Sequence, residues 1–154
     1  MIDDKTGKGI CVIDLDTIMQ GLAMNDFGDS IRFGASTAAE DEIDLTKVSC
    51  DMNLYEIYLR GFLKGCNGKL TSKEMELLPF GAKVMTFECG MRFLTDYLEG
   101  DHYFKIHREN HNLDRCRTQF KLVEDMENKW EIMQKITEKY RRMYKQEKSD
   151  YFGY

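Results

Sequence analysis

The chain has 154 residues, of which 42% are hydrophobic, 32% charged and 12% aromatic. This profile is typical of one globular domain and excludes a disordered chain. The formal net charge of −5 argues against nonspecific binding to nucleic acid or to an acidic membrane surface, so neither is expected as a partner.

The first fourteen residues are predicted to form a short β-hairpin. Turn-forming residues at 3–9 separate Met1-Ile2 from a continuous, mostly β-branched run at 10–13. Such a run is typical of a strand that is covered on both faces. The first strand has almost no length, which suggests a piece of a longer β-structure.

The remainder of the chain is predicted to be mainly α-helical. Residues 14–39 are expected to form an ordered loop with one helical turn, and an acidic, solvated stretch follows at 40–44. The domain is expected to cover 1–148, with a frayed tail at 149–154. Helices are expected from about 48 to the Asn67-Gly68 cap, from the Thr71–Glu74 capping box to Pro79, over 82–98, and as one long helix over 113–145.

Cysteine usage and hydropathy indicate the compartment. The five cysteines are scattered and form no C-x-x-C pair, which argues against a disulfide framework or a structural zinc site. No apolar run approaches the ~20 residues that a membrane helix needs, so no membrane partner is expected. A reducing cytoplasm is therefore the predicted location.

Two acids, Asp14 and Asp16, end the predicted apolar strand. They would point the same way if the strand continued, and two close carboxylates are costly without a cation. Hard oxygen ligands of this kind suit Mg²⁺, which takes one or two carboxylates plus substrate phosphates. The alternative is that both aspartates cap the following turn, because a lone D-x-D is common.

Three segments resemble the aminoglycoside phosphotransferase and choline kinase family, and most closely its sugar kinases that phosphorylate the anomeric hydroxyl of N-acetylhexosamines. They are VIDLDT at 12–17, DFGDSIR at 26–32, and RFLTDYL at 92–98 with DHYFK at 101–105. The resemblance covers about 1–125 and implies a bilobal, protein-kinase-like fold, of which this chain would form most of the helical C-lobe. Gln20 departs from the pattern, since relatives tend to carry proline there.

The resemblance implies roles for particular residues. Asp14, with Asp16 beside it, would hold the Mg²⁺ that bridges the phosphates of ATP. Asp29 would brace the loop. Arg92 and Tyr103 would contact the sugar, through a fork of donors and an aromatic ring.

The residues themselves also allow simpler interpretations of the substrate site. Arg92 could form a salt bridge with Asp96 four residues later on the same helix. Tyr103 could be a core residue.

The catalytic loop H-x-D-x-x-x-x-N and a Gly-rich phosphate loop are both missing from the sequence. The resemblance therefore implies the C-terminal part of a kinase, with the catalytic base upstream of Met1 and no activity in the isolated chain. Mg²⁺ and ATP are expected only for the longer parent. An exposed cleft or hairpin edge predicts self-association.

Two other functions stay open. A kinase of the same superfamily could act on choline, an amino alcohol or an aminoglycoside, since a cationic acceptor calls for an acidic or aromatic cage. A non-catalytic helical module that binds a sugar or a partner protein is the second. The acids that could serve a cationic acceptor are Glu88, Asp96, Glu99 and Asp101.

Overall fold

The computed structural model describes residues 1–16 and 18–151, with side chains up to residue 144. Thr17 of the 12–17 motif and residues 152–154 of the predicted tail lie outside the described residues. A mainly α-helical chain is confirmed. The elements are α1 (Ala23–Gly34), the 3-10 helix η1 (Leu45–Lys47), α2 (Met52–Cys66), α3 (Ser72–Glu99), α4 (His111–Asn128) and α5 (Trp130–Tyr151).

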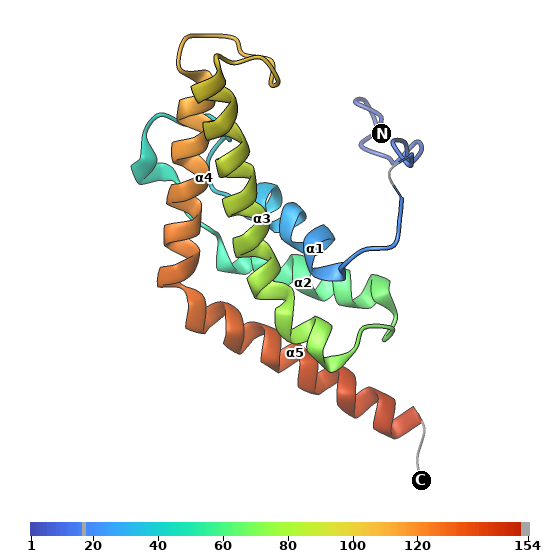
Figure 1. The fold of residues 1–154 in the computed structure, drawn as a ribbon. Helices are drawn as coiled ribbons and strands as arrows, with labels where there is room; N and C mark the ends of the chain where they lie inside the picture. The colour runs from blue at the N-terminus through green and yellow to red at the C-terminus, as the bar shows by residue number, and fades with distance from the viewer. Residues whose placement is uncertain (17, 152–154) are drawn as a thin grey trace.

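The predicted N-terminal β-hairpin was wrong. In the described part of the first 22 residues, strand-like pairing is limited to one isolated bridge between Ile2 and Gly9. The apolar run at 10–13 is exposed, with 78% of Val12 accessible, and Figure 1 shows this segment standing apart from the helices. A β-branched run forms a strand only where a neighbour supplies the ladder and covers its faces. The hairpin edge expected to drive self-association is therefore absent as well.

Helix α1 is longer than the single turn predicted within 14–39. It spans 12 residues and buries Phe27 and Ile31 completely. The many small residues in this stretch weaken the helical pattern, so tertiary packing rather than intrinsic propensity stabilises the helix.

Helix α3 joins two helices that were predicted to be separate. Its N-terminus has the predicted capping box, in which the side chains of Thr71 and Glu74 bind each other's backbone N–H groups. Pro79 lies buried inside the helix and does not end it. A proline removes one helical hydrogen bond, and burial of its ring in the core offsets that loss. The helix ends at Gly100, whose φ of 99° gives a left-handed cap.

The long helix predicted over 113–145 is instead two helices that meet at Lys129. The Lys129 ammonium donates to the Ser49 hydroxyl (2.6 Å), the Cys50 carbonyl (2.9 Å) and the Asp125 carboxylate (2.7 Å). These bonds tie the junction to the segment before α2. The break is therefore set by tertiary contacts. The sequence has no glycine or proline at the junction that would predict it.

The core lies where α1, α2, α3, α4 and α5 meet. Figure 1 shows α3 and α4 side by side, α1 crossing α3, and α5 running along one end of the molecule. The hydroxyls of Tyr55 and Thr137 share a buried hydrogen bond of 2.8 Å between α2 and α5. The largest fully buried side chains include Tyr55, Phe27, Ile31, Leu59, Leu78, Leu122, Met126 and Met133.

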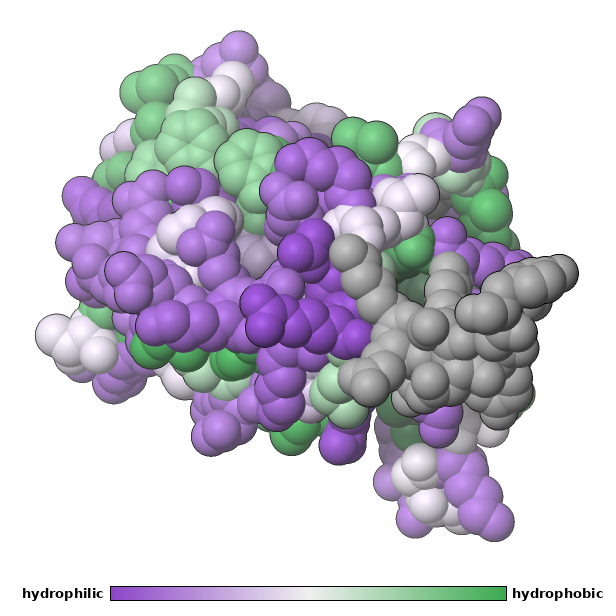
Figure 2. Space-filling view, turned by 90° about the horizontal axis from the view of Figure 1, so that it is seen from below, coloured by the Kyte–Doolittle hydropathy of each residue, from purple (hydrophilic) through white to green (hydrophobic). Residues whose placement is uncertain are grey.

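The surface at the α5 end is largely polar. Figure 2 shows this face from below, where hydrophilic side chains cover most of the area that is not grey. Within the described part of the chain, no helix combines the length and the apolar character required to cross a membrane.

Two glycines allow α1 and α3 to pack in direct backbone contact. A Cβ atom on Gly28 would overlap the backbone carbonyl of Gly81, and a Cβ atom on Gly81 would overlap the carbonyl of Met24. Farther along α3, a Cβ atom on Gly90 would lie 2.8 Å from the Phe120 ring of α4. Helix α3 is thus closely packed on two sides, and its position leaves no room for larger residues.

We predict that Gly81→Ala destabilises the protein, because the new methyl group meets backbone that cannot move aside. The expected loss of unfolding free energy is about 1–3 kcal/mol or more. Gly61→Ala on α2 is the matched control, since a Cβ atom there meets nothing within 4 Å, and should stabilise by about 0.5–1 kcal/mol. Urea denaturation of both variants measures the difference. Equal stability changes would contradict the close crossing of α1 and α3.

Candidate functional site

The structure brings Arg92 and Tyr103 together. Arg92 lies on α3, and Tyr103 lies in the loop between α3 and α4. The Arg92 Nη2 donates to the Tyr103 hydroxyl at 3.3 Å, and the guanidinium carbon lies 5.6 Å from the centre of the Tyr103 ring. Tyr103 is 74% exposed, so the alternative that it belongs to the core is wrong.

The two residues line one pocket of about 430 Å³. Met91 and Phe104 are among the apolar side chains of its wall, and Glu88 and Glu99 are acidic residues of the same wall. A small set of polar groups among apolar walls is characteristic of small-molecule sites. The full lining is Glu88, Met91, Arg92, Thr95, Asp96, Glu99, Tyr103 and Phe104.

A second pocket, of about 530 Å³, adjoins the first through Arg92. Its wall includes Asp29, which lies on α1. The Asp29 carboxylate accepts from Arg32 Nε at 2.9 Å, and Arg32 Nη1 donates to Glu40 at 2.7 Å. Asp29 thus helps to position an arginine that ties α1 to the segment after it. Three of the five residues expected from the resemblance therefore line two neighbouring pockets.

Asp96 does not form the salt bridge with Arg92 that the sequence allowed. Arg92 instead lies 3.7 Å from the Glu88 carboxylate, on the preceding turn of α3. Asp96 is only 4% exposed. Its carboxylate accepts from the backbone N–H groups of residues 102, 103 and 104, at 2.9, 2.7 and 2.9 Å. It therefore binds the loop that carries Tyr103.

The environment of Asp96 determines its pKa. Burial acts to raise the pKa of this carboxyl group, but the three backbone hydrogen bonds outweigh burial and hold the pKa below its ordinary value. Asn112 on α4 adds a fourth bond, from its Nδ2 at 2.8 Å. The same amide nitrogen binds Asp101 at 2.8 Å, and Arg115 Nη1 donates to the Asn112 oxygen at 3.1 Å.

The sequence analysis missed Asn112 and Arg115 entirely, and it considered Asp96 only as a partner for Arg92 or as an acid for a cationic acceptor. A polar residue within a charged helix carries no local signal that it will be buried. The grouping becomes visible only when α3, the loop and α4 are placed together in three dimensions.

Asp14 and Asp16 lie outside these pockets. Both are exposed in the N-terminal segment, and Asp14 has a positive φ of 63°, so the alternation assumed for a continuing strand is lost. Among the residues that the structure describes, no group of three or more His, Cys, Asp or Glu side chains could hold a metal ion. That Asp14 and Asp16 hold Mg²⁺ together with the phosphates of a nucleotide stays a prediction.

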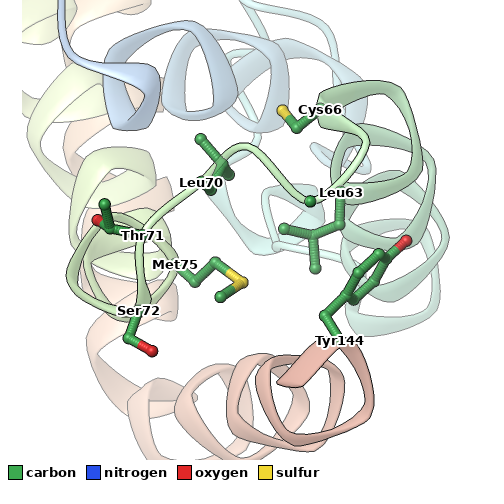
Figure 3. A pocket seen from close by; sticks show the side chains of 8 residues that line it. Leu63, Cys66, Leu70, Thr71, Ser72, Met75 and Tyr144 are labelled. Carbon is green, nitrogen blue, oxygen red and sulfur yellow. The ribbon is translucent and has the colours of Figure 1, made fainter. Parts of the chain in front are cut away.

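A third pocket, of about 160 Å³, lies between the end of α2, the start of α3 and α5. Figure 3 shows Leu63, Met75 and Tyr144 around it, with the Cys66 thiol at its edge. Burial raises the pKa of that thiol, which makes it a poor nucleophile at neutral pH. None of the residues expected from the resemblance lines this pocket. The pocket that both Arg92 and Tyr103 line is therefore the better candidate site.

We predict that Asp96→Asn lowers the stability of the protein in a pH-dependent way. Because the folded-state pKa lies below the ordinary value of 3.8, the charged carboxylate stabilises the fold above that pH and the effect is lost as pH falls through the folded pKa. Chemical denaturation at several pH values should show a wild-type advantage at pH 7 that shrinks below about pH 4. Asp16→Asn, at an exposed carboxylate, is the control. A wild-type advantage that is constant with pH would contradict this prediction.

A comparison with known families adds no assignment, because no family model matches the chain. The case for a function therefore depends on the residues and geometry described above.

Proposed function

We propose that this chain forms the sugar-binding part of an ATP- and Mg²⁺-dependent phosphotransferase that acts on the anomeric hydroxyl of an N-acetylhexosamine. One observation carries the proposal: Arg92 and Tyr103, which the resemblance to sugar kinases assigns to the substrate, lie in hydrogen-bond contact at the edge of one pocket. They come from different elements and are 11 residues apart in the chain. A cytoplasmic location belongs to the same proposal.

The pocket has the chemistry that a sugar requires. The Arg92 guanidinium offers a planar fork of donors for hydroxyl or amide oxygens. The rings of Tyr103 and Phe104, whose centres lie 4.8 Å apart, offer apolar surface for the C–H faces of a sugar. The carboxylates of Glu88 and Glu99 can accept hydrogen bonds from sugar hydroxyls.

The transfer step needs groups that are not in the printed sequence. The sequence contains no H-x-D-x-x-x-x-N motif and no Gly-rich phosphate loop. Phosphoryl transfer depends on such groups, because they position the reactants and stabilise the developing charge. We therefore propose that these 154 residues bind the sugar but need a base and phosphate-binding groups from outside them. Mg²⁺ at Asp14 and Asp16 would require the same additional groups.

A kinase for choline, an amino alcohol or an aminoglycoside is the second candidate. Two acids, Glu88 and Glu99, and the exposed Tyr103 ring are features of a site for a cation. The Arg92 guanidinium lies 3.7 Å from Glu88, however, and offsets the charge of that acid. The sugar therefore stays the first candidate.

We predict that isothermal titration shows binding of N-acetylglucosamine to the wild-type chain and weaker or no binding of choline. Arg92→Ala should weaken sugar binding at least about tenfold, because it removes a charge-assisted donor. Arg117→Ala is the matched control, since Arg117 is an exposed arginine on α4 outside both pockets. It should bind as the wild type does.

Three results would count against the proposal. Equal loss in Arg92→Ala and Arg117→Ala would show that the pocket is not the site. Tighter binding of choline than of the sugar would favour the second candidate. A wild-type chain that binds neither ligand would refute the sugar-binding role for this chain.

A further inference from the structure

The loop that carries Tyr103 begins with an unusual turn. Gly100 and Asp101 both have positive φ values, 99° and 60°, and so turn the chain sharply at the end of α3. After this turn the N–H groups of His102, Tyr103 and Phe104 point at one carboxylate, that of Asp96. Successive N–H groups that converge in this way form a concave site for an anion. Here the anion is a side chain of the protein itself.

The Asp96 carboxylate has used its capacity to accept hydrogen bonds. One oxygen accepts from residues 102 and 103, and the other accepts from Phe104 and from the Asn112 amide. A carboxylate has about four acceptor sites, and the group is almost completely buried. Although Asp96 forms part of the pocket wall, its oxygens have no acceptor site left for a ligand.

All four donors are uncharged. Among the described residues, no Lys or Arg forms an ion pair with Asp96. A buried charge without a counter-ion is retained only where hydrogen bonds compensate for its lost hydration. The buried charge of Asp96 is therefore compensated in this conformation of the loop, which supplies the three N–H donors. In the same conformation the Tyr103 hydroxyl contacts Arg92.

We propose that Asp96 is the positioning residue of the pocket lined by Arg92 and Tyr103: it fixes the backbone at residues 102–104 so that Tyr103 meets Arg92 and Phe104 lines the pocket, and it acts on the sugar only through these two rings. This inference rests on the proposed function for its sugar-binding part. Its structural part, the control of the loop by one carboxylate, stands on the hydrogen bonds alone.

The substitution Asp96→Ala tests the inference because it removes the carboxylate and leaves the three N–H donors in place. The gap has the size of a carboxylate group, so formate should enter it and accept from the same donors. Chloride at equal ionic strength is the control for a general salt effect. Glu76→Ala is the matched control variant, since Glu76 is an exposed carboxylate on the same helix and contacts Lys73.

Two readouts are needed. The first is hydrogen exchange at the amides of residues 102–104, which should become at least about tenfold faster in Asp96→Ala, because each amide loses its acceptor. The second is the affinity for N-acetylglucosamine, which should fall at least about tenfold. Formate should restore both in Asp96→Ala, and should change neither in Glu76→Ala.

A double-mutant cycle separates positioning from general destabilisation. If Asp96 acts through Tyr103 and Phe104, then Asp96→Ala should cost no further affinity in a background that carries both Tyr103→Ala and Phe104→Ala. Additive losses of affinity would overturn the positioning role. If Asp96→Ala does not fold, Asp96→Asn takes its place: it fills the gap, so exchange should rise without a response to formate.

The outcomes distinguish this inference from the proposed function. Slow, wild-type exchange at residues 102–104 in Asp96→Ala would overturn the inference even if the wild type binds the sugar. If formate slows amide exchange to the wild-type rate but does not restore the affinity for the sugar, the claim that Asp96 positions the pocket would be overturned. A wild-type chain that binds no N-acetylglucosamine would refute the proposed function and the sugar part of the inference, while the exchange arm decides the loop part.

Discussion

The close crossing of α1 and α3 is the constraint on which the candidate site depends. Gly28 and Gly81 lie where each helix meets the backbone of the other, so the separation of the two axes is set by main chain rather than by adaptable side chains. This crossing places Asp29 of α1 in the same pocket wall as Arg92 of α3. Arg92 also lines the pocket with Tyr103, so one rigid helix connects both cavities.

The helical character of the chain could be predicted from local patterns, because periodic apolar residues and the Thr71–Glu74 capping box act within a few residues. The errors arose where distant contacts decide the outcome. The run at 10–13 has strand propensity but no partner to pair with. Pro79 is tolerated inside α3 because it is buried, and α4 ends at Lys129 because that ammonium binds the segment before α2. None of these contacts is visible in a local pattern.

The candidate site was predictable only in part. The resemblance to sugar kinases predicted that Arg92 and Tyr103 contact the substrate, and the structure places these two residues in contact with each other. It also named Asp14, which lies exposed in the N-terminal segment and outside the pockets. The role of Asp96 could not be foreseen, because it depends on a turn that aims three N–H groups at one carboxylate. Asn112 contributes from α4, and only the packed fold brings it to that carboxylate.

The central claim is that the pocket between α3 and the α3–α4 loop binds a sugar. The most direct measurement is a two-dimensional ¹H–¹⁵N NMR titration of the isotope-labelled chain with N-acetylglucosamine. We predict saturable shift changes confined to the amides of residues 88–104 and to their neighbours on α4. Shift changes that centre on the pocket of Leu63 and Met75 shown in Figure 3, or a spectrum that does not change, would contradict the claim.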